Sequence, residues 1–409
     1  MTQMFSGMDY LKIDVASMFG LDKEVWDKRI EWFNAHENEL ESLIEQADAR
    51  NCYLAAVNAY RDAKAGKPIG YPINLDATAS GCQVLALLMG DKKAAMRVNL
   101  VNTGAREDLY TYIYNIMKQE APVATTLTRD QVKKSIMTSL YGSEAKPKEV
   151  FGEANYEIFE RVMDRELKGV WRLNKFLLNH WDPTKTEYSW TMPDNFHVTC
   201  TVTKKVQYEA KCLGEDISFV KEIKGCTEKG RFLSANLAHS VDGLINREIT
   251  MRANLSDDFK AYLRKLVDLN TVLADFGRSD YNQSKASLKM FKTLWKRYEE
   301  TGFLSARILQ YVTPETLKLV GVNGIKDIRN LIDSLPEKSF EVFAIHDCFR
   351  VLPNYGNSMR QQYRYVCKQI AESHLLDHIV SSMFDTEMHF EKMSDDLGEL
   401  VMHSEYAIC

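Results

Sequence analysis

Several features are scarce or absent in this 409-residue chain, and each absence excludes a class of protein. The eight cysteines form no Cys-x-x-Cys pair and have no regular spacing, which argues against a disulfide framework or a zinc ribbon. No apolar run approaches the ~18 residues of a membrane-spanning helix. The first nine residues, Met-Thr-Gln-Met-Phe-Ser-Gly-Met-Asp, lack the basic and apolar regions of a signal peptide. We therefore expect a soluble intracellular protein with free thiols.

An excess of positive charge is also missing. The chain has 52 Lys and Arg against 57 Asp and Glu, a net charge of −5, and a pI near 6.1. A general nucleic-acid coat protein would be basic overall, so that class is disfavoured. A cleft that binds nucleic acid needs only local positive charge. Such stretches occur at residues 92–97, 129–134, 204–205 and 221–231, although most charged stretches are solvated surface.

The length predicts two or three subdomains, and the pattern of apolar residues predicts mostly helices. One helix is expected after Asp22, a good N-cap residue. The other helices are expected at 53–64, 84–89, 105–120, 150–180, 236–252, most of 255–337 and 357–384. Extended segments are expected at 71–75, in a hairpin within 190–206 and twice within 340–353. The sequence therefore predicts an α+β fold, mostly helical with a small antiparallel sheet.

A helix between Thr128 and Ser143 has an unusual face. Thr125, Thr126 and Thr128 offer capping oxygens at its start, and Gly142 is a typical helix stop. Four residues recur at every fourth position and would form one slowly turning stripe: Arg129, Lys133, Met137 and Tyr141. Two cations, a thioether and a phenol suit a triphosphate at one end and a sugar and base at the other. A solvated amphipathic helix is the alternative.

Two aspartates lie next to predicted extended segments. Asp76 ends one segment and Asp347 lies at the turn of another. Each alone is an ordinary turn residue. Together they meet the need of phosphoryl transfer by two metal ions, because carboxylates from different strands can hold two Mg²⁺ ~3.5–4 Å apart. Mg²⁺ prefers a few carboxylates together with phosphate and water.

The order of the motifs resembles that of the single-subunit RNA polymerases of bacteriophages and mitochondria. Asp76-x-x-x-Ser80-Gly81-x-Gln83 is similar to the first palm motif of that family, Arg129-x-x-x-Lys133-x7-Tyr141-Gly142 to its fingers helix, and His346-Asp347 to its second palm motif. Weaker similarities occur at His239-Ser-Val-Asp242-Gly243, Phe19-Gly-Leu-Asp-Lys23 and the apolar tail 405–409. The motifs keep the family's order over nearly the whole chain.

The resemblance implies a right-hand polymerase palm and fingers, and a role for each matching residue. Asp76 and Asp347 would hold two Mg²⁺. Lys133 would contact the triphosphate and could protonate the leaving pyrophosphate. The remaining substrate contacts would be Arg129 at the phosphates, Tyr141 with Gly142 and Met137 near the sugar and base, His239 at the primer end or ribose, Tyr110 in the substrate site, and Lys23 at a phosphate. A surface lysine is the alternative for Lys23, and a packing aromatic for Tyr110.

The resemblance also implies that parts of the enzyme lie elsewhere. Residues 1–75 contain no Asp-x-x-Gly-Arg motif, and the family's thumb and amino-terminal domain have no counterpart. We expect a split enzyme in which a second subunit supplies these parts. The implied division is 1–104 as first part of the palm, 105–238 as fingers, and 239–409 as second part of the palm with the tail. Residues 254–336 exceed the family pattern and are interpreted as a helical insertion.

The implied activity is DNA-directed synthesis of RNA. The partners would be a DNA template, nascent RNA, ribonucleoside triphosphates and the second subunit, in the cytoplasm of a bacterial host of a phage. A related DNA polymerase and a non-catalytic polymerase-like nucleic-acid-binding subunit remain as alternatives. Gly81 and Cys348 favour ribonucleotides, because the DNA polymerases carry Glu in the first motif and His-Asp-Glu in the second. No Tyr-x-Asp-Asp of a reverse transcriptase occurs, and the motif 374–378 lacks the Glu of a zinc protease.

Overall fold

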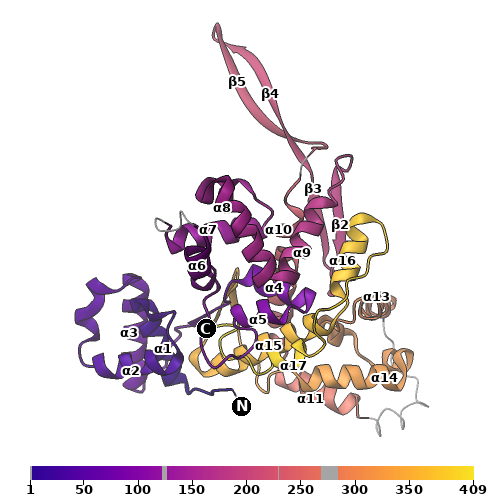
Figure 1. The fold of residues 1–409 in the computed structure, drawn as a ribbon. Helices are drawn as coiled ribbons and strands as arrows, with labels where there is room; N and C mark the ends of the chain where they lie inside the picture. The colour runs from indigo at the N-terminus through magenta and orange to yellow at the C-terminus, as the bar shows by residue number, and fades with distance from the viewer. Residues whose placement is uncertain (1, 122–126, 229, 269–283) are drawn as a thin grey trace.

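The computed structural model describes residues 2–121, 127–228, 230–268 and 284–409 (Figure 1). Most of these residues are helical, and the strands form small antiparallel sheets. The predicted α+β class is therefore confirmed. Thr125 and Thr126, two of the expected capping residues, lie outside the described residues.

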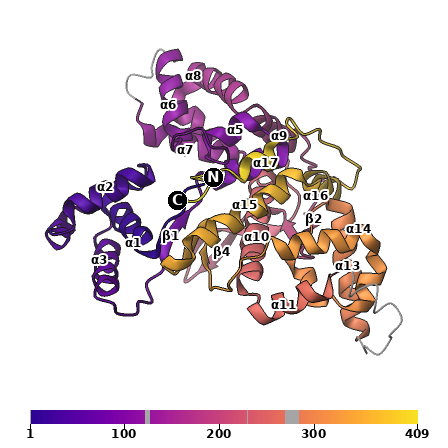
Figure 2. The ribbon, with the colours of Figure 1, turned by 90° about the horizontal axis from the view of Figure 1, so that it is seen from below.

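The amino-terminal residues form a group of helices at one side of the molecule (Figures 1 and 2). They are α1 (Gly7–Ala16), η1 (Ser17–Leu21), α2 (Trp26–His36), η2 (Leu40–Gln46) and α3 (Arg50–Lys64). The prediction of Asp22 as an N-cap was wrong, because α2 begins after Val25 and has no side-chain cap. The backbone carbonyl of Asp22 instead accepts a hydrogen bond from Arg29 Nη2 at 2.5 Å.

The central sheet joins two distant parts of the chain. Strands β1 (Ile73–Asp76), β7 (Cys348–Val351) and β6 (Phe343–Ile345) lie in that order, and both pairs are antiparallel. The tail borders the other edge of β1, where Asp76 O accepts from Cys409 N at 2.9 Å and Asp76 N donates to Cys409 O at 3.2 Å. Buried Asp14 on α1 accepts from Tyr71 Oη at 2.6 Å and fixes the start of the strand.

Helices pack around this sheet. They are α4 (Ser80–Met89), α5 (Lys92–Arg97), α6 (Leu109–Glu120), α7 (Arg129–Leu140), α8 (Ala145–Glu166), α9 (Lys168–Asn179) and α10 (Leu233–Asn254). Residues 81–89 of α4 are buried, as expected for an apolar helix inside the main core. Thr128 caps α7 in a capping box with Gln131, and Gly142 follows the helix with φ +85°. A β-carbon there would also lie 2.4 Å from Arg231 O, so glycine is required.

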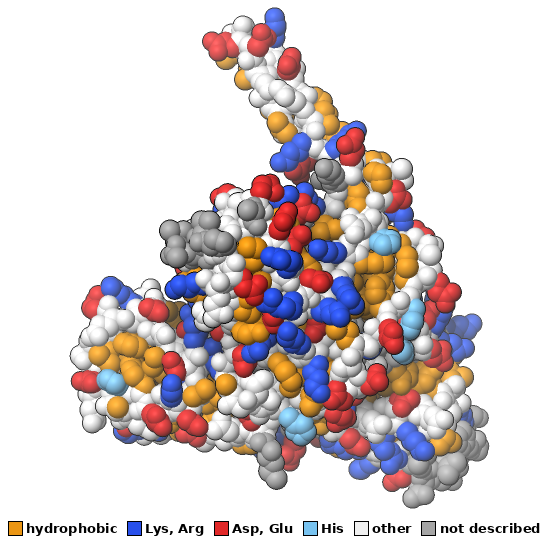
Figure 3. Space-filling model, in the orientation of Figure 1, with side chains coloured by type: hydrophobic (Ala, Val, Ile, Leu, Met, Phe, Trp, Pro, Cys, Tyr) orange, Lys and Arg blue, Asp and Glu red, His pale blue; other side chains and the backbone are white. Residues whose placement is uncertain are grey.

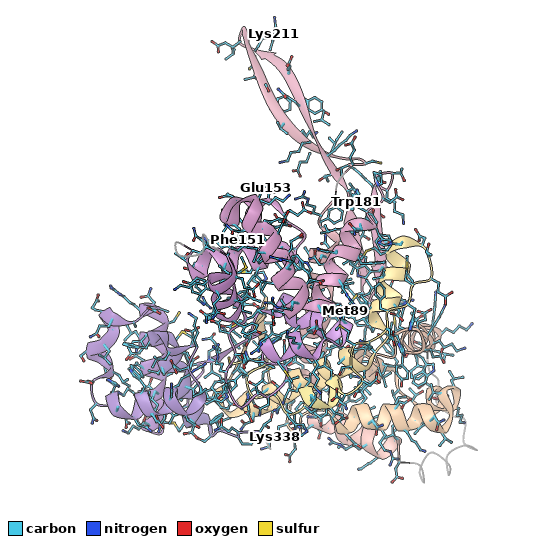
Figure 4. The ribbon with its side chains drawn as sticks, in the orientation of Figure 1. Met89, Phe151, Glu153, Trp181, Lys211 and Lys338 are labelled. Carbon is cyan, nitrogen blue, oxygen red and sulfur yellow. The ribbon has the colours of Figure 1, made fainter. Side chains whose placement is uncertain are left out.

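Two hairpins follow α9. The first, β2 (Glu187–Thr191) with β3 (His197–Thr201), lies where a hairpin was predicted. The second, β4 (Thr203–Cys212) with β5 (Glu215–Lys224), was not predicted beyond its first residues. It extends away from the body of the molecule, with Lys211 near its tip (Figure 4). Most of its residues on both faces are exposed.

The carboxyl-terminal part has a smaller core of its own. Helices α11 (Asp257–Leu266), α13 (Lys285–Thr301), η4 (Ala306–Tyr311) and α14 (Pro314–Asp333) enclose a separate cluster that includes Leu263, Phe291 and Ile328. Residues 269–283 lie outside the described part. After the central sheet come η5 (Pro353–Tyr355), α15 (Gly356–Glu372), α16 (Leu375–Phe384) and α17 (Leu397–Val401). This second core is what the sequence predicted as a helical insertion.

Candidate active site

A cavity of about 600 Å³ lies where the ends of the central strands meet helices α4, α6, α7 and α10. Its lining combines acidic, basic and aromatic side chains from segments far apart in the sequence. The residues are Ala77, Ala79, Ser80, Gly81, Cys82, Tyr110, Lys133, Met137, Leu140, Tyr141, His239, Asp242, Gly243, Asn246, His346 and Asp347. Six predicted site residues therefore line one cavity: Tyr110, Lys133, Met137, Tyr141, His239 and Asp347.

The two predicted metal-binding aspartates come from neighbouring strands. Asp76 ends β1 directly opposite Cys348, the first residue of β7. Asp347 precedes Cys348 in the turn between β6 and β7, and its carbonyl accepts from Ala77 N at 3.0 Å. His346 has a φ of +56°, a strained backbone angle for a residue with a side chain, and Asn246 Nδ2 donates to its carbonyl at 3.0 Å. The turn therefore holds Asp347 beside the end of β1.

Asp76, Asp347 and Asp242 form an acidic group, in which the charge of Asp347 affects the ionisation of the other two carboxyls. Asp76 is exposed at the residue level and does not line the cavity, yet desolvation around its carboxyl and the charge of Asp347 raise its pKa. Asp242 on α10 is half-buried, and burial together with Asp347 raises its pKa to about 7. The charge of Asp347 therefore disfavours the anionic forms of Asp76 and Asp242 unless a cation lies among the carboxylates.

Helix α7 presents part of its predicted stripe to the cavity. Lys133, Met137 and Tyr141 line it, whereas Arg129 turns to α6 and pairs with Asp108 at 2.5 Å. Burial opposes ionisation of Asp108, but hydrogen bonds from Arg129 and Thr111 outweigh it and lower its pKa. Lys133 Nζ lies 5.4 Å from the ring centre of Tyr110, and Arg129 Cζ lies 5.9 Å from the same ring. Arg129 thus helps to position Tyr110 in the described arrangement.

The aromatic end of the cavity is closely packed. The Tyr141 and His239 rings are 5.4 Å apart at 55°. Gly81 lies against the Tyr141 phenol, so that a β-carbon on Gly81 would be 2.9 Å from Tyr141 Oη. Burial, with the nearby charges of Asp242 and Asp347, raises the pKa of Tyr141. The phenol is therefore held as a neutral hydroxyl facing the acidic group.

Besides Arg129, two more predicted substrate contacts lie outside the cavity lining. Gly142 is buried behind Tyr141 and serves the backbone turn. Lys23 is exposed between η1 and α2, and its carbonyl accepts from Arg106 Nη1 at 3.2 Å. Among the residues that the structure describes, the Lys23 ammonium makes no hydrogen bond or ion pair with a residue of the cavity lining, so its role as a phosphate contact stays a prediction.

Two lining residues were not assigned a role from the sequence. Asp242 and Asn246 lie on α10 with His239 and Gly243, at spacings of three, four and seven residues. Residues at those spacings share one face of a helix. Asp242 already belongs to the His239 motif, and extending that motif by one turn would have identified Asn246.

The donor set can be compared with the needs of Mg²⁺. The described residues contain no group of three or more His, Cys, Asp or Glu placed to hold a metal ion by themselves. Asp76 and Asp347 supply two carboxylates, and Mg²⁺ bound by one or two carboxylates completes its shell with water and substrate phosphates. The like charges that raise the pKa of Asp76 would be offset by such a cation. The residues present therefore fit Mg²⁺ shared with a phosphate substrate.

In the part of the chain that the structure describes, every helix is too short or too polar to pass through a bilayer.

Comparison with known families relates the first part of the chain, which carries one of the strand-borne acids and the cationic helix, to one family. Residues 4–180 match the family of DNA-dependent RNA polymerases. This region includes Asp76 and all of α7, whereas His239 and Asp347 lie beyond it. The match confirms, for this part of the chain, the resemblance inferred from the motifs.

Particular relatives are polymerases of phages and mitochondria. The chain is 27% identical over 175 residues to the DNA-directed RNA polymerase of Pseudomonas phage phiKMV, which covers 34% of this chain and 21% of that protein. It is 29% identical over 161 residues to a probable DNA-directed RNA polymerase of Neurospora crassa, which covers 34% of this chain and 18% of that protein. It is 28% identical over 163 residues to the mitochondrial DNA-directed RNA polymerase of Schizosaccharomyces pombe, which covers 33% of this chain and 14% of that protein. The matched part thus spans about a fifth or less of each relative.

Proposed function

We propose that this chain is the catalytic subunit of a DNA-directed RNA polymerase. It would add ribonucleotides to an RNA 3′ end under the direction of a DNA template. The observation that carries the proposal is the convergence of Asp347, Lys133 and Tyr141 on one cavity, with Asp76 on the adjoining strand. The relatives named as DNA-directed RNA polymerases support the same reaction class.

In the proposed mechanism, Asp76 and Asp347 hold two Mg²⁺. These ions, when bound, lower the pKa of the attacking 3′ hydroxyl and stabilise the leaving pyrophosphate. Lys133 binds the triphosphate through its ammonium group and donates a proton to the leaving pyrophosphate. Arg129 adds positive charge once a phosphate competes with Asp108 for its guanidinium.

The remaining residues would select and orient the nucleotide. Tyr141, packed against Gly81, would contact the 2′ position of the sugar through its hydroxyl, and Met137 would contact the base. His239, whose ring lies beside that of Tyr141, would contact the primer end or the ribose, and Tyr110 beside Lys133 would line the substrate site. The lack of a side chain at Gly81 and the Cys348 after Asp347 favour ribonucleotides over the alternative of a DNA polymerase.

The proposal includes a division of labour between two chains. Residues 1–104 and 239–409 would form the palm, residues 105–238 the fingers, and a second subunit would supply the thumb, the amino-terminal domain and the Asp-x-x-Gly-Arg motif. The chain should then be poorly active alone and form a stable heterodimer.

Primer extension with Mg²⁺ and ribonucleoside triphosphates tests the reaction. The protein co-purified with its partner should extend an RNA primer on a DNA template, and Asp347→Asn should lower the rate by more than about 100-fold. Asp164→Asn, the same change at an exposed position on α8, serves as the matched control. Activity that survives Asp347→Asn would overturn the mechanism. Full promoter-independent elongation by the single chain would overturn the split enzyme.

A further inference from the structure

Helix α13 in the smaller carboxyl-terminal core has two contrasting faces. Phe291 and Leu294 point inward and are buried, at 0% and 2% exposure. The outer face carries four exposed lysines at successive steps of four, three and four residues: Lys285, Lys289, Lys292 and Lys296. Because 3.6 residues make one turn, these steps keep all four side chains on one side of the helix. We call them the α13 lysine strip.

The strip has few counter-charges. In the described ranges of the chain, Lys285, Lys289 and Lys292 have no carboxylate within ion-pair distance, and Lys296 lies 3.6 Å from Glu300 at the end of the strip. On the face that Figure 3 shows, by contrast, Lys and Arg are interspersed with Asp and Glu over much of the surface. A row of four lysines in a protein of net charge −5 creates a local positive potential that favours an anionic partner.

The shape of the strip suits a linear polyanion. Its lysines border a shallow groove of about 440 Å³ together with Leu288 and Thr293. The eleven steps from Lys285 to Lys296 span about 16 Å at 1.5 Å per step. This length is well above the axial rise of ~3.4 Å per phosphate of one DNA strand, so the strip can meet more than one phosphate. A single small anion would occupy only one part of such a row.

We infer that the α13 lysine strip binds the sugar–phosphate backbone of nucleic acid independently of base sequence. This inference rests on the proposed function, since a polymerase holds nucleic acid beyond its active site. Figures 1 and 2 place α13 on the other side of the molecule from α6 and α7, so the contact lies outside the cavity. The strip belongs to the segment interpreted as an insertion, and gives that segment a role in holding template or product.

Salt-dependent binding without nucleotides tests the inference apart from catalysis. Fluorescence anisotropy of labelled random-sequence duplex DNA, single-stranded DNA and RNA is measured with the full protein between about 50 and 200 mM salt. Log affinity falls with log salt concentration, and each lost phosphate contact makes this fall shallower by ~0.9 for duplex and ~0.7 for single strands. The double variant Lys289→Gln with Lys292→Gln should therefore reduce the magnitude of the slope by about 1.8 on duplex or about 1.4 on single strands. The probe whose slope changes identifies the nucleic acid that the strip binds.

Lys28→Gln with Lys338→Gln is the matched control, because it removes the same charge at exposed sites on α2 and at the lower edge of the molecule (Figure 4). The control should leave the slope unchanged, and both double variants should keep the melting temperature. An unchanged slope for Lys289 and Lys292 on all probes would overturn the inference. The inference would also be overturned if the strip lysines were needed for binding vesicles of anionic phospholipid but not for binding nucleic acid. Loss of primer extension by Asp347→Asn is scored separately and tests only the proposed function.

Discussion

Gly81 and Tyr141 meet so closely that the phenol occupies the space of a side chain on the glycine. A β-carbon on Gly81 would lie 2.9 Å from Tyr141 Oη and 3.4 Å from two ring carbons. These are side-chain atoms at the tip of Tyr141, so the tyrosine and not the backbone would have to move. The first motif and the α7 helix are thus linked through one contact at the aromatic end of the cavity.

Gly81→Ala should displace Tyr141 and weaken ribonucleotide use. We expect kcat/KM for ribonucleotides to fall about tenfold, which corresponds to ~1.4 kcal/mol of transition-state stabilisation. Steady-state primer extension measures it. Gly70→Ala is the control, because a β-carbon there meets no atom within 4 Å. Equal rates for both variants would show that the phenol position is unimportant.

Tyr141→Phe should relax the choice between ribose and deoxyribose. The variant keeps the ring and removes only the hydroxyl, which we propose reads the 2′ position. A hydrogen bond of this kind contributes about 1–2 kcal/mol, so discrimination should fall by roughly 5- to 30-fold while the ribonucleotide rate changes little. Competition between the two nucleotide types on one template gives the ratio. Unchanged selectivity in Tyr141→Phe, with Tyr114→Phe as a control outside the cavity, would remove Tyr141 from this role.

Asp242→Asn should stabilise the protein at alkaline pH when Mg²⁺ is absent. The pKa of Asp242 is about 7 in the folded protein, because of burial and Asp347, and ~3.9 in an unfolded chain. As pH rises from about 4 to about 7, the unfolded chain releases its proton first, so folding stability is lost in that window. The asparagine avoids this loss.

Chemical denaturation at pH 5 and pH 8 measures the effect. Because Asp242 is half-exposed, we expect a discounted gain of about 1–2 kcal/mol at pH 8 that shrinks toward pH 5. Buried Asp14 and Glu248, whose pKa values are also raised, to about 6 and about 7, contribute equally to both proteins and cancel. A gain that is the same at both pH values would contradict the assignment.

Gln83→Leu should release the tail from α4. Gln83 is fully buried; its Nε2 donates to Val98 O at 2.8 Å and to Ala407 O at 2.9 Å, and its Oε1 accepts from Tyr363 Oη at 2.6 Å. Leucine removes all three hydrogen bonds, each worth about 1–3 kcal/mol where a buried partner is left unpaired. Ala407 O still accepts from Thr78 N at 3.3 Å, so the loss falls mainly on Val98 O and Tyr363 Oη. We expect a marked loss of unfolding free energy and faster proteolysis near residue 407. Tyr363→Phe removes only one of these bonds and should cost about 1 kcal/mol; equal effects would count against this network.

The elements that the sequence predicted well are those with local signals. Helix α7 follows from its capping residue Thr128 and from Gly142, and the hairpin of β2 and β3 from the turn at Pro193 to Asn195. The hairpin of β4 and β5 was missed because neither face is buried, so no alternating pattern marks it. Its two-residue turn, Leu213 and Gly214, has φ of +53° and +88°, but leucine is not a typical residue for such a turn.

The cavity could be predicted only in part. Asp347 and Lys133 were recognisable because carboxylates and cations carry chemistry by type and motif. The pairing of Arg129 with Asp108 was not, since it depends on how α6 packs on α7. The position of Asp76 at the edge of the cavity likewise depends on the register of β1 with β7, which a single sequence does not encode locally.

The strand pairing of the central sheet also determines when this cavity can exist. Strand β1 is synthesised well before its neighbour β7 and before Ile408, which pairs with Ala77. At about 5–20 residues per second, the ribosome needs roughly a quarter of a minute to a minute to pass from Asp76 to Phe343. During that time Asp76 has no partner strand, so a chain that stops before Phe343 would carry helix α7 without the paired strands that hold Asp76 beside the Asp347 turn.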